Sequence, residues 1–117
     1  MNLEDSHKMV EYIQTSLWNF AESDPHLLQP FLELALSVKT VTRIELSSLY
    51  FYMMYNKAED LRIAINQCDA ELKTASTEES RVQLINKLET LQKDQRKLDK
   101  ICDAFASAGI SYSEFLK

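Results

Sequence analysis

Glycine is almost absent from this sequence and proline is scarce: the chain has one glycine and two prolines. Tight turns between β-strands depend on these residues, so few turns and a small number of long elements are expected. A glycine-rich phosphate-binding loop is excluded by the same count. The composition therefore favours a small protein built from long helices.

Long apolar runs are also missing, and none approaches the roughly 20 residues that a membrane span needs. Residues 1–8 lack the basic and apolar regions of a secretory signal, so a cytoplasmic location is expected. The formal net charge of −5 opposes binding to a phosphate backbone. Nucleic acid is therefore not an expected partner.

Cysteine and histidine occur only twice each. Cys68 and Cys102 fall too far apart along the predicted helices for a disulfide, so we expect two buried, inert thiols. Glu4 and His7 form an E-x-x-H pair of the kind used in diiron bundles, but the chain has no second pair. His26, beside Pro25, is expected at the surface. The sequence predicts no enzyme, no cofactor and no metal site.

What the sequence does contain is a regular apolar pattern between residues 42 and 108. Steps of three and four residues, the spacing of a left-handed helix seam, run along two arms. The first arm contributes Ile44, Phe51, Met54, Ala58, Leu61, Ile65, Cys68, Leu72 and Ala75. The second contributes Leu84, Leu88, Leu91, Gln95, Leu98, Cys102 and Phe105. We expect the arms to be antiparallel, with Ile65 facing Leu88.

Local signals mark the ends of these arms. Thr42 with Glu45, and Ser76 with Glu79, each match a capping box, so helices are predicted to begin at both places. Gly109 follows the second arm and is suited to a left-handed helix stop, because it has no side chain to penalise positive φ.

Two further helices are predicted before the hairpin. Asp24 and Pro25 supply an N-cap and a first helical residue for the second of them. Pro30 predicts a kink or break near Gln29.

A second apolar stripe near the base of the arms is predicted to receive the two N-terminal helices. It consists of Leu46, Leu49, Tyr50, Met53, Ile101, Ala104, Phe105 and Ala108.

The predicted fold is all-α: a small helical bundle with a long antiparallel coiled-coil hairpin. Helices are expected at about 4–22, 25–38, 43–75, 77–108 and 112–117. The chain is predicted to form a single domain, with a head of residues 1–56 and 98–117 and a projecting hairpin of residues 57–97.

Ten side chains are candidate contacts with a partner or a second copy. They are Tyr50, Tyr52, Met53, Tyr55, Ile63, Val82, Ile85, Lys93, Arg96 and Lys97. Each group has a structural alternative. The aromatic and methionine residues also suit core packing, single surface apolar residues are normal, and interleaved charges are typical of a solvated helix face.

Three functions are compatible with this sequence. The favoured one is a helical protein-interaction module, such as an adaptor, assembly factor, chaperone or inhibitor, acting through the hairpin or the aromatic head, with another protein as partner and a homodimer expected. The first alternative is a dimeric coiled-coil module that associates with acidic membranes or acts as a scaffold. The second is a helical bundle that binds a metal or another ligand.

Overall fold

The protein is all-α in a computed structural model that describes residues 3–38 and 41–111, with side chains from residue 8 onward. Helix α1 (Leu3–Ser23) leads through a 3-10 turn, η1 (Pro25–Leu27), into α2 (Leu28–Ser37). Helix α3 (Arg43–Phe51) continues through a π-helical segment, η2 (Tyr52–Lys57), into α4 (Ala58–Thr74), and α5 (Glu78–Ser107) follows. The predicted C-terminal helix at 112–117 and the side chains of Glu4 and His7 lie outside the described ranges.

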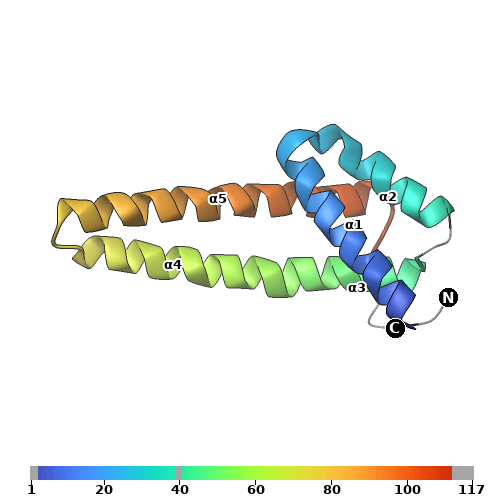
Figure 1. The fold of residues 1–117 in the computed structure, drawn as a ribbon, viewed down its shortest axis with the longest axis horizontal. Helices are drawn as coiled ribbons and strands as arrows, with labels where there is room; N and C mark the ends of the chain where they lie inside the picture. Colours follow the sequence, from blue (N-terminus) through green and yellow to red (C-terminus); the bar gives the residue numbers. More distant parts are fainter. Residues whose placement is uncertain (1–2, 39–40, 112–117) are drawn as a thin grey trace.

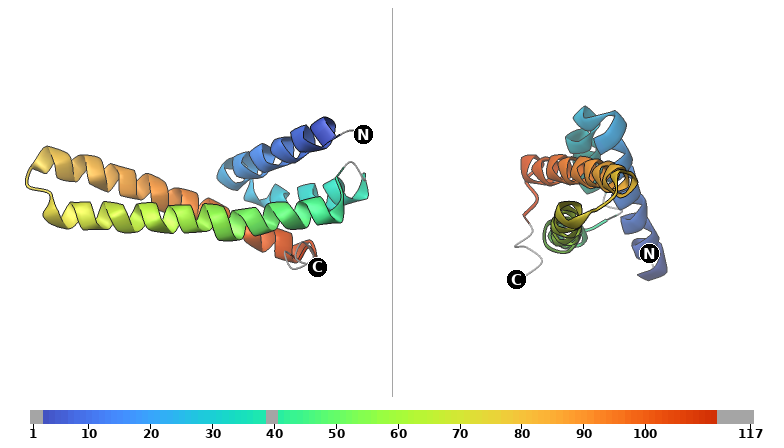
Figure 2. Two further views of the ribbon diagram at one scale, coloured as in Figure 1. Left: turned by 90° about the horizontal axis from the view of Figure 1, so that it is seen from below. Right: turned by 90° about the vertical axis from the view of Figure 1, so that its left-hand side faces the viewer.

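Helices α4 and α5 lie side by side, run in opposite directions and extend away from α1, α2 and α3 (Figure 1). The molecule is accordingly elongated, with extents of 55 × 29 × 26 Å. Views along and across the long axis show α1 and α2 gathered at the end of the hairpin that is remote from its turn (Figure 2). The division between head and projecting hairpin at residues 57 and 97 stays a prediction. Trp18 of α1 contacts Lys57 and Lys97 at this boundary.

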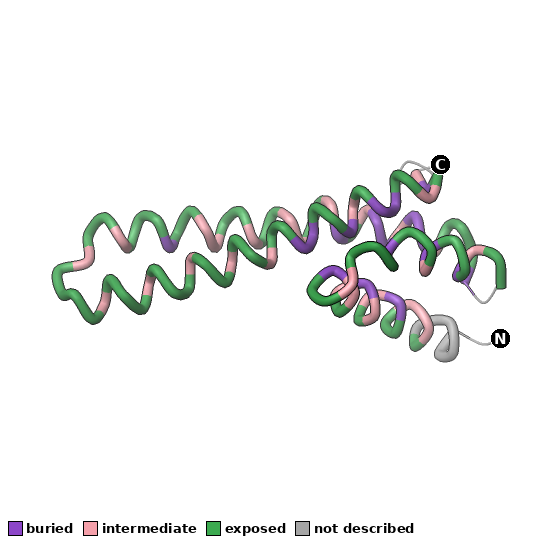
Figure 3. The backbone as a smooth tube through the Cα atoms, turned by 90° about the horizontal axis from the view of Figure 1, so that it is seen from above, coloured by how far each residue is buried: buried purple, intermediate pink, exposed green. Residues whose placement is uncertain are grey.

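The core sits where the N-terminal helices meet the hairpin (Figure 3). Ile13, Leu17 and Ala21 recur every fourth residue on α1 and are buried, which is the spacing that places side chains on one helical face. Tyr50 of α3 stacks on Phe105 of α5 with ring centroids 4.9 Å apart. The rest of the buried core comprises Leu28, Leu32, Ala35, Val41, Leu46, Leu49, Met53, Leu98, Ile101, Ala104 and Ile110.

Further from the head, α4 and α5 contact each other through a single row of inward-facing side chains. Most are half-buried, and only Cys68 is fully buried there, where its thiol donates to the Leu84 carbonyl at 3.2 Å. In the predicted register Cys68 would face Ile85, so the pairing agrees to within one residue. Gln95, expected on the seam, is exposed.

The first arm is helical from Arg43 to Thr74, as predicted for residues 43–75, but it is not a uniform α-helix. The backbone widens at η2, where the Ala58 N–H donates to the Met53 carbonyl five residues back. An α-helix turns about 100° per residue, so one extra residue in a turn moves the seam by one position. The predicted second stripe of Leu46, Leu49, Tyr50 and Met53 is buried, as expected, whereas the shift leaves the predicted seam residue Ile44 62% exposed.

The helix ends follow the local signals with two corrections. The Thr42 capping box forms, with the Glu45 N–H donating to the Thr42 hydroxyl at 3.1 Å. At the turn, Thr77 rather than Ser76 is the cap and accepts from the Ser80 N–H at 3.2 Å. Both residues are good N-caps, so sequence alone does not separate neighbouring starts.

The second correction concerns Asp24, whose side chain makes no capping bond. Its carbonyl instead accepts from the Leu27 N–H at 2.9 Å, as a 3-10 turn requires. The break expected near Gln29 falls between Leu27 and Leu28, so Pro30 lies in the first turn of α2, where no N–H is needed.

Gly109 ends α5 as predicted, with φ of +79°. The Gly109 N–H donates to the Ala106 carbonyl at 3.1 Å and the Ile110 N–H donates to the Phe105 carbonyl at 3.0 Å. This double hydrogen bond is a Schellman motif, and it brings buried Ile110 back onto the core beside Phe105. Arg43 also donates to the Gly109 carbonyl, which ties the start of α3 to the end of α5.

Candidate interaction site

The predicted contact residues fall into three places. Tyr50 and Met53 are buried in the core of the single chain, so neither is presented to a partner in this conformation. Tyr52, Tyr55 and Ile63 are exposed, each by between 42% and 47%. Val82 and Ile85 lie at the far end of the hairpin, and Lys93, Arg96 and Lys97 lie where α1 meets α5.

The far end of the hairpin carries a shallow apolar hollow that we call the tip patch. Val82 is 51% exposed and Ile85 is 43% exposed, and both line the hollow together with half-buried Leu72 from α4. Ser76, Thr77, Glu78 and Arg81 complete its lining. The hollow has a volume of about 490 Å³. The hollow brings together apolar side chains from both arms and has polar and charged residues around them. The exposed apolar residues at the tip therefore form one contiguous surface.

Helix geometry explains why Val82 and Ile85 are available. The seam of α5 passes through Leu84 and Leu88, and at about 100° per residue Val82 and Ile85 point away from that line. They are three residues apart and therefore neighbours on one side of the helix. Ile63 sits two residues from seam residue Leu61, on the outer face of α4, and it does not line the tip patch.

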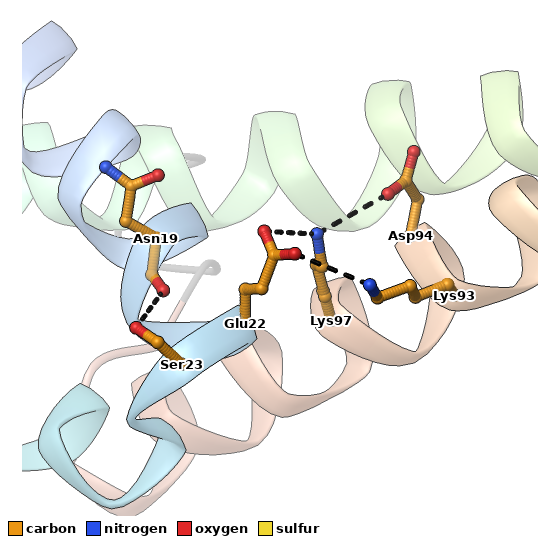
Figure 4. A network of polar contacts seen from close by, with 6 residues as sticks. All are labelled: Asn19, Glu22, Ser23, Lys93, Asp94 and Lys97. Atoms are coloured by element: carbon orange, nitrogen blue, oxygen red, sulfur yellow. Dashed lines mark hydrogen bonds and ion pairs between the residues drawn. The ribbon is translucent and has the colours of Figure 1, made fainter.

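The second surface is built around Glu22 at the end of α1. Its carboxylate accepts from Lys97 Nζ at 3.0 Å and from Lys93 Nζ at 3.4 Å (Figure 4). These two lysines lower the pKa of the Glu22 carboxyl, with the Lys97 hydrogen bond as the largest cause. Lys97 Nζ also lies 3.8 Å from Asp94 on its own helix.

The same lysine is held by an aromatic ring. Lys97 Nζ lies 5.7 Å from the centroid of Trp18, and Lys57 Nζ, from η2, lies 4.3 Å from that centroid. Such cation–π contacts are favourable, and they fix Trp18 between the two arms of the hairpin. Trp18, Glu22 and Lys57 were not among the predicted contacts, because their meeting depends on how α1 crosses the hairpin.

The aromatic segment supplies fewer surface groups than its composition suggests. Tyr50 stacks on Phe105, and Phe51 contacts Tyr55 with ring centroids 4.7 Å apart. Tyr52 and Tyr55 are the exposed members of the segment, and Phe51 and Met54 are half-buried. Core packing thus accounts for Tyr50 and Met53.

The two cysteines lie on different arms of the hairpin, Cys68 on α4 and Cys102 on α5. Both are free thiols, and Cys102 is half-buried. Burial raises the pKa of the Cys102 thiol to about 11, with smaller contributions from Asp99 and Asp103. At neutral pH this thiol is protonated and a weak nucleophile.

Over residues 8–38 and 41–111, no group of three or more histidine, cysteine, aspartate or glutamate side chains is placed to hold a metal ion. None of the described helices has both the length and the apolar character needed to cross a bilayer. Comparisons with protein-family models, curated proteins and solved structures found no match for this chain.

Proposed function

We propose that this chain is a non-enzymatic helical interaction module that binds another protein through the tip patch of the α4–α5 hairpin. The observation that carries the proposal is the shared hollow in which Leu72, Val82 and Ile85 meet. The hollow lies beside the turn from α4 to α5, the end of the hairpin over which α1 and α2 do not extend (Figure 1).

Apolar side chains that stay in water forfeit the free energy that burial would provide, about 25 cal/mol per Å². A partner that covers the hollow recovers this free energy. The charged residues Glu78 and Arg81 at its edge supply hydrogen-bonding groups that orient the partner, in the usual arrangement of an apolar centre with a polar rim. A helix or helical pair laid across both arms suits such a surface.

The test is capture from a native extract with matched surface variants. Val82→Lys and Ile85→Lys each place a charge in the hollow, and Gln83→Lys makes the same kind of change on an exposed neighbour turned about 200° from Ile85 around the helix. A partner that binds at the tip is retained by the parent protein and Gln83→Lys and lost from both hollow variants. Equal capture by all four proteins overturns the proposal.

A second copy of the chain is the alternative occupant of the tip patch. Ile63 lies on the side of α4 that faces away from Leu72, and it offers a further exposed apolar position for contact with that copy. Light scattering at high micromolar concentration separates the two cases. A dimer that Val82→Lys converts to monomer makes the partner another copy. A monomeric mass for the parent protein removes self-association and leaves a different protein as the partner.

A further inference from the structure

The junction between α1, η1, α2 and α5 forms a groove with an unusual charge. Two hollows, of about 240 and 350 Å³, share Lys100 and so lie end to end along α5. One wall is made by α1 and the turn that follows it, with Ala21, Glu22, Pro25 and His26. The other is made by α5, which contributes Lys93, Arg96, Lys97, Lys100, Asp103, Ala104 and Ser107. We call this feature the basic groove.

The cations are gathered by helical spacing. Lys93, Arg96, Lys97 and Lys100 occupy positions i, i+3, i+4 and i+7 of α5, which share one face of a helix. The whole chain has a formal net charge of −5, yet the lining of the groove holds four cations against the two carboxylates of Glu22 and Asp103. The groove is therefore a positive site on an acidic protein.

Glu22 shows that the groove can bind a carboxylate. Its carboxylate, on a side chain that is 53% exposed, is bound by two lysines at once. Lys97 is 8% exposed and is fixed by Glu22, Asp94 and Trp18, so it belongs to the wall. Arg96 and Lys100 are exposed and pair with no carboxylate among the described residues. Two cations remain open beside a carboxylate that is already bound.

We propose that the basic groove binds an acidic segment of a protein partner, with its carboxylates on Arg96 and Lys100 and a further carboxylate competing with Glu22 for Lys93. This inference rests on the proposed function, since it assigns a chemistry to a second contact with a protein partner. Glu22 acts as an internal competitor: it occupies part of the groove until a stronger acidic ligand displaces it.

A peptide fits these observations better than a nucleic acid or a membrane. The open cations lie in a groove between helices, where a single extended segment can enter. A duplex or a lipid surface covers a wide area and meets the rest of an acidic protein, which repels it. Duplex DNA and phosphatidylserine vesicles are therefore the comparison ligands.

The test is fluorescence anisotropy with a short, labelled, glutamate-rich peptide at low salt. Arg96→Gln with Lys100→Gln is expected to weaken binding roughly threefold to tenfold, since each exposed charge pair contributes modestly. Lys73→Gln with Lys87→Gln removes the same charge outside the groove and is expected to leave the affinity within about twofold. Glu22→Gln is expected to tighten binding, whereas Glu71→Gln, with the same change in net charge, is not.

The inference is overturned if the peptide shows no saturable binding, or if Glu22→Gln leaves the affinity unchanged. It is also overturned if the double variant in the groove and the double variant outside it weaken binding equally. Tighter binding of the DNA or of the vesicles than of the peptide overturns it in favour of that ligand. Val82→Lys should not change the peptide affinity, because Val82 does not line the groove. The groove proposal and the tip-patch proposal can therefore fail independently of each other.

Discussion

Glu22 joins α1 to the hairpin through ion pairs with Lys93 and Lys97 of α5. Because Lys97 and Lys93 lower its pKa in the folded protein, the folded state favours the ionised carboxylate more than the unfolded state does. The ion pair therefore contributes stability above the unfolded pKa, and this contribution is lost as the pH falls through the folded pKa.

Glu22→Gln should accordingly lower the melting temperature at neutral pH, and the difference from the parent protein should shrink toward zero in acid. Thermal unfolding followed by circular dichroism over a pH series measures this. Glu71→Gln is the control, since Glu71 makes no ion pair among the described residues. A difference for Glu22→Gln that stays constant across the series contradicts the assignment.

The sequence predicted some residues of the two candidate sites, but not the residues that contact them. Val82 and Ile85 stand out because they are apolar and off the seam, and both are exposed as expected. The partners of Lys93 and Lys97 were not predictable, because Glu22 lies 71 and 75 residues away in the chain. Only the packing of α1 brings them together.

At the scale of elements, periodicity predicted both arms, and before residue 58 it identified the buried stripe of Leu46, Leu49, Tyr50 and Met53 but wrongly placed Ile44 on the seam. Apolar residues between 44 and 54 occur on several faces, so both a continuous helix and a shifted one match the sequence. The choice is made by tertiary packing: with the extra residue in η2, Leu46, Tyr50 and Met53 enter the core. Helix propensity carries no information on this shift.

The π-helical segment gives a direct test of that explanation. Deleting Asn56, an exposed residue within η2, removes the extra residue and rotates α3 by about 100° relative to α4. Leu46, Tyr50 and Met53 then leave the core, so we expect a loss of roughly 3 kcal/mol or more in the free energy of unfolding.

Urea unfolding measures this loss, with Asn56→Ala as the matched control. Replacing an exposed polar residue by alanine should change the stability by no more than about 0.5 kcal/mol. A deletion variant as stable as Asn56→Ala would show that the register of α3 does not depend on the π-helical turn.

At the scale of the whole molecule, the distribution of buried residues separates two roles. The thick end, where α1, α2 and α3 meet the hairpin, holds nearly all fully buried side chains (Figure 3). The far end holds exposed apolar residues over a single inner line of contacts. The buried core thus lies at one end of the molecule and the tip patch at the other.

The measurement that tests this proposal most directly is site-specific photo-crosslinking in the native cell extract. A benzophenone side chain placed at Val82 or Ile85 should give a discrete covalent adduct with one protein, and the same group at Gln83 should not. A different protein in the adduct supports a heteromeric partner, and a second copy supports the dimer. No adduct from either hollow position, or equal adducts from Gln83, would contradict the claim that the tip of the hairpin binds a protein.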